Sequence, residues 1–527
     1  MDVSGWNESC MIAFMTRARL SAFSWRELCF ASSLVGLIFI NSSGLAQAQS
    51  QRLPSLGEGV SVSVTQENQW GQDALSALWR SGSVIDDPLL TDYLALQWLP
   101  LQRAATALGW LNNGTGDMYE WRLLPIRDAQ INAFALPGGV VGVHTGLLSA
   151  TPNAESVAAV LAHELSHVAL RHIARMIDAQ NRNAPWVLGA ILLGVAAAGS
   201  SPDLANAAIV GGQAAAIQSS INFTRDMEVE ADRVGLAIYQ TAGMPAGGFV
   251  EMFEVLQQAS RLNDDGSFGY LRTHPLTPDR ITQARLRAHS LSQVDTSPET
   301  KRAQRLHPWV QMRAQVMSSE RTDDWRAWWQ QAQGPVQPLL LYRGALAAAE
   351  LKEQGSAEAL LLKAHQMLGD DDLGRNVVQQ ALMQLWARQP QASPAMTTAT
   401  TAQWVKSGLQ SNDRSTLLSA CELGLRLGWT QDVASRLQWW VSERPHDVLA
   451  WRLLGQARQA QNRPIAALGA QAEAQWAMND LAGARDRLQA ALDASRHQPA
   501  SVEDAQAISA RLRWMKEQIS NKALGNR

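Results

Sequence analysis

Cysteine is scarce in this chain, and the shortage limits the kinds of site that it can build. The 527 residues contain three cysteines, and two of them, Cys10 and Cys29, lie in an expected secretory leader that ends near Ala48. Cys421 alone would remain in the mature chain. A single thiol supports neither an internal disulfide nor a cysteine-based metal site. Any zinc site must therefore use histidine and carboxylate side chains.

Strong charge and long hydrophobic runs are also missing. The formal net charge is −3 and the sequence pI is about 6.4, so no basic field indicates a nucleic-acid partner. The apolar runs at 28–40 and 186–199 are shorter than the roughly 20 residues that a membrane-spanning helix needs. The composition is that of a globular, mainly helical protein long enough for two or three domains.

The first 48 residues have the pattern of a signal peptide. Arg17, Arg19 and Arg26 precede the apolar run 28–40, and Ala46-Gln47-Ala48 fits the rule for the cleavage site. We therefore expect export, with cleavage near Ala48. The alternative is a single membrane anchor, for which the run is short.

A second apolar segment covers residues 186–217. Its apolar run at 186–199 is closed by Asp203 and is too short to span a bilayer, and a run of small residues follows to residue 217. We expect a hydrophobic helical hairpin that packs over the site or forms a lid. Peripheral contact with a membrane is the weaker alternative.

The segment 156–171 contains the pattern H-E-x-x-H. His163 and His167 would lie one turn apart on the same face of a helix, where both imidazoles can bind one zinc ion. Glu164 would then accept the proton of the water that zinc activates. The alternative is a buried helix with two hydrogen-bonded histidines.

Residues around this pattern favour a helix. Thr151 is expected as the N-cap and Pro152 as the first helical residue. Apolar side chains recur at three- and four-residue steps, which predicts one buried face: Val157, Val160, Leu161, Leu165 and Val168.

A later helix, expected over 222–233, offers a third ligand. Glu228 and Asp232 would lie one turn apart on it, and a glutamate completes a His₂Glu zinc site with one open position. Asp232 would then accept the outer N–H of a zinc-bound histidine. Glu230 is the rival to Glu228, and it is otherwise expected on a solvated face.

Other third ligands are weaker. The longer pattern H-E-x-x-H-x-x-G-x-x-H would require glycine and histidine where the chain has Leu170 and Ile173. The class of metallopeptidases with that pattern is therefore excluded. His172 is expected on another face of the helix, at the surface. His274, in a loop between prolines, could reach the metal and occupy its open position, or be an ordinary loop histidine.

Two strands are expected before the helix that carries H-E-x-x-H, at 121–126 and at 131–143. The second of these segments contains Pro137-Gly138-Gly139. A strand beside a metal site offers an edge to which a substrate peptide can add. The candidates for this contact are Gly139, Val140, Val141, Gly142 and Val143. The alternative is an internal strand of a small sheet.

The residue pattern of the sequence changes after residue 290. A polar linker is expected at 291–300, between a domain at 49–290 and a helical domain at 301–527. Pro445, the run 451–455 (W-R-L-L-G) and Ala467 fit a helix–turn–helix repeat of about 34 residues. Such repeats stack into a surface that binds proteins. The alternative is an ordinary helical bundle.

Four segments together carry a family resemblance: N-A-F-A-L-P-G-G, H-E-L-S-H, R-D-M-E-V-E-A-D-R and R-T-H-P-L-T-P-D-R. They resemble the periplasmic zinc metallopeptidases typified by the β-barrel assembly-enhancing proteases. The HtpX heat-shock protease and the CAAX prenyl endopeptidase are more distant relatives. The resemblance covers residues 86–280, and the C-terminal repeats agree in kind only.

The resemblance implies a mainly α fold with a small β-sheet, in which a gluzincin-type peptidase domain precedes tetratricopeptide-like repeats. It implies one Zn²⁺ per chain, bound by His163, His167 and Glu228, with Glu164 as the general base. His274 matches a histidine that can take the fourth zinc position and keep the enzyme latent.

The same resemblance implies a function. The expected substrates are unfolded or stalled outer-membrane proteins, and the repeats would contact the outer-membrane assembly machinery from the periplasm. One alternative is a chaperone or adaptor whose protease domain stays latched. Another is an integral membrane protease, like the distant relatives.

Overall fold

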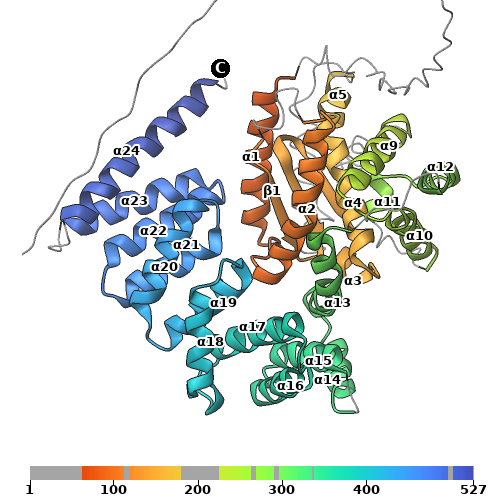
Figure 1. Ribbon diagram of the computed structural model, residues 1–527. Coiled ribbons are helices and arrows are strands. Elements are labelled where there is room, and N and C mark those ends of the chain that lie inside the picture. The colour runs from red at the N-terminus through yellow and green to blue at the C-terminus, as the bar shows by residue number, and fades with distance from the viewer. Residues whose placement is uncertain are drawn as a thin grey trace, which may run out of the picture. The chain divides into compact units, whose positions relative to one another are not determined.

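The computed structural model describes residues 62–111, 119–179, 225–262, 269–289, 296–334, 337–496 and 502–525. These residues form many helices and one small sheet, as expected for the fold class (Figure 1). The expected leader at 1–48 and the apolar segment at 186–217 lie outside the described residues. Within the described ranges, none of the helices is both long and apolar enough to cross a bilayer.

Two helices precede the sheet, α1 (Val64–Ser81) and α2 (Pro88–Ala107). The sequence D-D-P starts α2 as expected from its capping chemistry. Asp87 is the N-cap and accepts a hydrogen bond from the Leu90 amide at 3.0 Å, while Pro88 takes the first helical position. The buried face of α2 then packs against the helix that carries the H-E-x-x-H pattern and against the sheet.

The sheet has three strands, β1 (Arg122–Ile126), β2 (Ala133–Leu136) and β3 (Val140–His144), in the order β1-β3-β2. β3 is parallel to β1 and antiparallel to β2. The tight turn between β2 and β3 uses Gly138 and Gly139, whose φ angles of 74° and 83° lie in the left-handed region that favours glycine.

The strand predicted to receive a substrate is the central one. Val140 to Val143 pair with β1 on one side and with β2 on the other, and Gly139 belongs to the turn. A strand that is paired on both sides has no free N–H and C=O groups for a peptide. The prediction for Gly139, Val140, Val141, Gly142 and Val143 is therefore wrong, and its alternative, an internal strand, is what the structure shows.

The helix with the H-E-x-x-H pattern is α4 (Ala154–Ala169), which follows the short helix α3 (Thr145–Ala150). Its N-cap is Asn153 rather than Thr151, because the Asn153 side chain accepts a hydrogen bond from the Ser156 amide at 2.9 Å. α4 is buried on nearly every side, since α2, α9, α10 and β2 all pack against it. A helix held in this way is a rigid support for a site.

Within the described residues, five further helices follow α4 before residue 290. They are α5 (His172–Ala179), α9 (Arg225–Thr241), α10 (Gly247–Leu262), α11 (Gly269–Thr273) and α12 (Pro278–His289).

The C-terminal half is a series of helices that pack on their neighbours in sequence (Figure 1). They are α13 (Pro298–Ser318), α14 (Thr322–Gln331), α15 (Pro338–Glu350), α16 (Gln354–Met367), α17 (Asp372–Arg388), α18 (Ala399–Leu409), α19 (Arg414–Arg426), α20 (Thr430–Glu443), α21 (Val448–Ala460), α22 (Pro464–Ala477), α23 (Leu481–Ser495) and α24 (Val502–Gly525).

The motif predicted for a repeat falls on the helix pair α21 and α22. Gly455 lies where these two helices meet, and a Cβ added to it would be 3.4 Å from the carbonyl oxygen of Ala467. The pair is a helical hairpin, which agrees with the expected helix–turn–helix unit.

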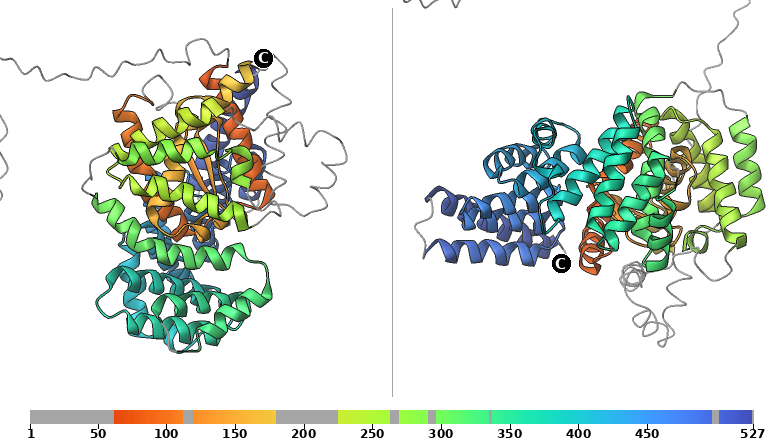
Figure 2. Two further views of the ribbon diagram at one scale, coloured as in Figure 1. Left: turned by 90° about the vertical axis from the view of Figure 1, so that its right-hand side faces the viewer. Right: turned by 90° about the horizontal axis from the view of Figure 1, so that it is seen from below.

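α13 begins at Pro298, inside the linker predicted for 291–300, and it packs on both halves of the chain. On one side it contacts α2, α3 and α4, and on the other α15 and α17 (Figure 2). His307 shows the first contact: its Nδ1 lies 2.7 Å from the Tyr93 hydroxyl and its Nε2 lies 3.0 Å from the carbonyl oxygen of Thr151.

Consecutive acidic residues at the start of α2 bind arginines of the C-terminal half. Asp87 accepts hydrogen bonds from Nε and Nη2 of Arg313 at 2.8 and 2.5 Å. Asp86 accepts one from Arg414 at 2.9 Å, and Arg414 also pairs with Asp447. These ion pairs are largely buried, so each carboxylate depends on its arginine to balance its charge.

Candidate metal centre

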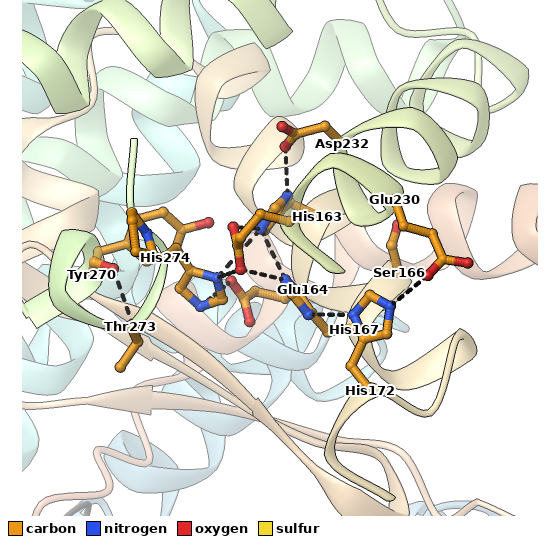
Figure 3. A network of polar contacts seen from close by, with 12 residues as sticks. His163, Glu164, Ser166, His167, His172, Glu230, Asp232, Tyr270, Thr273 and His274 are labelled. Carbon is orange, nitrogen blue, oxygen red and sulfur yellow. Dashed lines mark hydrogen bonds and ion pairs between the residues drawn. The ribbon is translucent and has the colours of Figure 1, made fainter. Parts of the chain in front are cut away.

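Four side chains expected around a metal lie together in the interior. His163 and His167 come from α4, Glu228 from α9, and His274 from the residue after α11. Each offers one ligand atom, and these atoms all lie within 4.8 Å of one another. The four side chains are buried. Figure 3 shows the rings of His163, His167 and His274 pointing toward a common point.

The distances between these atoms are close to those between donors around one ion, and two of them are slightly shorter. The Nε2 atoms of His163 and His167 are 3.0 Å apart, and Nδ1 of His274 is 3.4 Å from Nε2 of His163. The Glu228 carboxylate lies 3.4 Å from His163 Nε2, 3.5 Å from His167 Nε2 and 3.0 Å from His274 Nδ1. Zinc bonds of about 2.0–2.2 Å place tetrahedral donors about 3.3–3.6 Å apart.

Local sequence explains why α4 and α9 meet so closely. On each helix the two functional residues are one turn apart and therefore on one face. At the crossing, Gly235 of α9 faces α4, where an added Cβ would lie 3.1 Å from Ser166 Oγ and 3.2 Å from the Ala162 carbonyl oxygen. The absence of a side chain there lets the Glu228 carboxylate reach both histidines.

Glu164 faces the same space from α4. Its side chain is buried, and its Oε1 lies 3.6 Å from Nε2 of His274. Among the described residues, this Oε1 has no hydrogen-bond partner. An unpartnered carboxylate oxygen beside the cluster is available to a water molecule or a substrate N–H group.

Known proteins resemble this chain in sequence. Residues 105–288 match the sequence profile described as Peptidase family M48. The "Beta-barrel assembly-enhancing protease" of Escherichia coli O157:H7 is 31% identical over 466 residues, which cover 84% of this chain and 87% of that protein. The chain belongs to peptidase family M48. A protein of the same name from Escherichia coli strain K12 is 30% identical over the same shares, and the "Mitochondrial metalloendopeptidase OMA1" of Arabidopsis thaliana is 30% identical over 39% of this chain and 38% of that protein.

As an M48 peptidase the chain is a zinc metalloendopeptidase, and the residues present fit that metal. Two imidazoles and a carboxylate are ligands that zinc prefers. Burial lowers the pKa of His167 well below its ordinary value, which keeps this ring in the neutral form that binds metal. At His163 burial also lowers the pKa, but hydrogen bonds with Asp232 and Glu228 outweigh it and raise the pKa to about 9, so zinc must displace a proton from this ring to bind.

Asp232 of this M48 peptidase lies behind His163, as expected for an outer partner. Its Oδ1 is 3.0 Å from His163 Nδ1, the ring nitrogen that points away from the cluster (Figure 3). Burial raises the pKa of Asp232, but hydrogen bonds from Arg280 and His163 outweigh this effect and hold its pKa below the ordinary value. Asp232 is therefore a carboxylate that accepts the His163 N–H.

Arg280 is a site residue that sequence reasoning did not single out. It donates two hydrogen bonds to Asp232, at 2.6 and 2.8 Å, and its Nη1 lies 2.8 Å from Glu228 Oε2. Nη1 also donates to the carbonyl oxygen of Pro275, next to His274. Arg280 thus neutralises two buried carboxylates and fixes the loop. The available signal was its position in the R-T-H-P-L-T-P-D-R segment.

The predictions for His172 and Glu230 need correction. His172 is buried rather than at the surface, because α4 ends at Ala169 and Arg171 has a φ of 53°, so the helical periodicity does not continue to residue 172. Its Nε2 lies 3.3 Å from Glu230, which also accepts a hydrogen bond from Arg175 at 2.9 Å. Glu230 therefore pairs with α5 and is not part of the metal cluster.

Proposed function

We propose that this M48 peptidase acts in the periplasm, where it hydrolyses unfolded or stalled outer-membrane proteins and assists the assembly of others. The buried cluster of four ligand atoms carries the hydrolytic part of this proposal. The named relatives, β-barrel assembly-enhancing proteases that match over most of their length, support the choice of substrate. A leader at 1–48, cleaved near Ala48, would deliver the chain.

In the proposed mechanism, His163, His167 and Glu228 would hold the zinc ion. When bound there, it would supply a Lewis acid that polarises the scissile carbonyl and acidifies a water molecule. Glu164 would accept a proton from the attacking water and pass it to the leaving amine. Asp232 holds His163 in the tautomer that presents Nε2 to the metal.

The substrate peptide is proposed to add to the outer edge of β2. This strand lies at one edge of the three-stranded sheet and packs against α4. Within the described residues, its side away from β3 is paired with no further strand. An extended chain at an open strand edge gains main-chain hydrogen bonds without a specific sequence, which suits an enzyme that acts on unfolded proteins.

The helical hairpins after residue 300 are proposed to form a tetratricopeptide-like domain, separate in function from a peptidase domain at 49–290. Stacked helical hairpins present an extended surface for proteins. We propose that this surface binds substrates or the outer-membrane assembly machinery. Peripheral contact with the membrane would be an additional role of the segment at 186–217.

Zinc removal tests the proposed function. Purified protein is expected to contain one zinc ion per chain and to cleave an unfolded substrate such as casein. A strong chelator should abolish cleavage, and added Zn²⁺ should restore it. Metal analysis by mass spectrometry and gel-based proteolysis make the measurement. Full cleavage by protein that contains no metal would refute the proposal.

Latency is proposed to come from His274. Its Nδ1 lies among the ligand atoms, and its Nε2 is 3.6 Å from the general base, so the ring fills the position where water and substrate must bind. His274→Ala is expected to keep the zinc ion and to cleave casein faster than the wild type. The initial rate at matched zinc content is the measurement.

A buried histidine outside the cluster provides the control for His274. His144 lies on β3 and is as buried as His274, so His144→Ala removes an imidazole from the same half of the chain. It should not raise the rate. A His274→Ala rate equal to or below the wild-type rate, with zinc retained, would contradict the latch.

The position of His274 also favours a second function. If the ring remains in the cluster during the cell's normal growth, the chain would act as a chaperone or adaptor with a largely inactive protease domain. Its zinc would then be mainly structural. The effect of Glu164→Gln on outer-membrane integrity separates the two functions.

A further inference from the structure

A second buried histidine lies behind the metal cluster, and none of the steps above uses it. Nδ1 of His172 is 2.8 Å from Nδ1 of His167, and the two rings meet edge to face with centroids 4.8 Å apart. On its other side, Nε2 of His172 is 3.3 Å from Glu230 Oε2. Figure 3 shows this row running from the cluster through His172 to Glu230.

Zinc binding at His167 would fix where the protons lie in the row of His167, His172 and Glu230. Nε2 of His167 faces the cluster, so it must be unprotonated to bind zinc, and the proton of the neutral ring lies on Nδ1. The nitrogen opposite it, Nδ1 of His172, must then accept. A neutral His172 consequently carries its proton on Nε2 and donates it to Glu230. Every contact in the row is satisfied by this single arrangement.

We propose that His172 is a positioning residue for the zinc site: it accepts the Nδ1–H of His167 and so fixes the tautomer and the orientation of that ligand. This inference rests on the proposed function, because it takes His167 as a zinc ligand. Outer hydrogen bonds of this kind raise ligand basicity, and their loss typically weakens metal binding about 10–100-fold.

The chain contains a specific device that places His172. Arg171 has a φ of 53°, which turns the backbone out of α4 and brings the next residue under His167. The strained turn is held by Glu67 of α1, which accepts a hydrogen bond from Arg171 Nε at 2.9 Å and one from Tyr119 at 2.8 Å. A left-handed non-glycine residue persists only when its surroundings hold it.

The two zinc-binding histidines therefore have different partners. His163 has a carboxylate, Asp232, whose charge is balanced by Arg280. His167 has a neutral imidazole on its outer side, and the carboxylate on that side, Glu230, lies one ring further away and pairs with Arg175. A second carboxylate directly on His167 would place more negative charge in a space that already holds Glu228 and Asp232.

The test compares two substitutions of His172 in the full chain. His172→Leu fills a similar volume but leaves the His167 N–H without an acceptor. His172→Asn places an amide oxygen near the former position of Nδ1 and restores the acceptor. Zinc affinity is measured by competition with a chromophoric chelator. The expected result is a loss of about 10–100-fold for His172→Leu and near wild-type affinity for His172→Asn.

His307→Leu is the control for the loss of a buried imidazole. His307 contacts Tyr93 and Thr151 instead of the cluster, so its substitution should lower the melting temperature without changing zinc affinity. Equal affinity for His172→Leu and the wild type would overturn the proposal. Equal weakening of both His172 variants would also overturn it, since packing rather than an acceptor would then be responsible.

A further variant separates this inference from the proposed function. His167→Ala removes the ligand itself, so it should reduce zinc affinity more than His172→Leu does. Wild-type affinity of His167→Ala would show that the ligand set is wrong. If His167→Ala loses zinc but His172→Leu does not, the ligand set stands and the role of His172 is refuted.

Discussion

Glu164→Gln is expected to reduce casein cleavage by about 10²- to 10⁴-fold, the usual contribution of a general base, while the protein keeps its zinc ion. The amide has nearly the shape of the carboxylate but cannot accept the proton of the attacking water. Glu164 is buried beside the ligand atoms without being one of them, so metal binding should not change. Steady-state rates and zinc content are the measurements.

The same helix offers a matched control for this variant. Glu155, in the first turn of α4, accepts a hydrogen bond from Gln304 of α13 and is far from the cluster along the helix. Glu155→Gln makes the same chemical change and should retain activity. A Glu164→Gln enzyme that cleaves at the wild-type rate would rule out its role as the base.

The variant also decides between the enzyme and the adaptor. If cells with Glu164→Gln lose outer-membrane integrity as cells without the protein do, hydrolysis is the function that matters. If they are fully protected, the chain serves as an adaptor and its protease activity is secondary. Sensitivity to large antibiotics that an intact outer membrane excludes is a suitable measure.

Arg313→Ala is expected to cause a large loss of stability although it lies away from the metal. Its guanidinium group is buried and donates to Asp87, to the Tyr342 hydroxyl at 3.1 Å and to Gln384 at 2.8 Å. Removing it leaves the buried Asp87 carboxylate without a counter-charge, which typically costs about 3–5 kcal/mol. Because α2 and α13 meet at this pair, both halves of the chain should be affected.

Chemical unfolding by urea, followed by circular dichroism, measures this loss. Arg302→Ala is the control on the same helix: the Arg302 side chain is 54% exposed and pairs with Asp413 near the surface. Exposed ion pairs contribute at most about 1 kcal/mol. Equal unfolding midpoints for the two variants would show that the buried Arg313 pair contributes no more to stability than the exposed Arg302 pair.

Much of the candidate site could be predicted from residues that are close in sequence. The spacing of His163 and His167, and that of Glu228 and Asp232, places each pair on one face of a helix whatever the rest of the fold does. The helix that carries the histidine pair was predicted from capping residues and apolar periodicity, and both it and the helix expected over 222–233 are present. The N-cap is Asn153 rather than Thr151, because the Thr151 hydroxyl donates a hydrogen bond to the Leu147 carbonyl oxygen instead.

The incorrect predictions concern contacts between distant segments. His172 was assigned to the surface because the helix was expected to continue, whereas a left-handed residue at Arg171 ends it. Arg280 had no recognisable partner until α12 packed near α9. The sequence of residues 139–143 does not indicate whether this strand lies at the centre or at the edge of a sheet.

The sequence by itself determined the chemistry that this chain can perform: histidines and acids at helical spacing, with Cys421 as the one cysteine outside the expected leader at 1–48. Periodicity and capping depend on neighbours a few residues away, so a linear sequence contains them. Only the tertiary structure decided which strand lies at the centre of the described sheet, which histidine contacts the outer side of His167, and which arginine balances the carboxylates. These depend on packing between segments far apart in the chain, where local spacing gives no information.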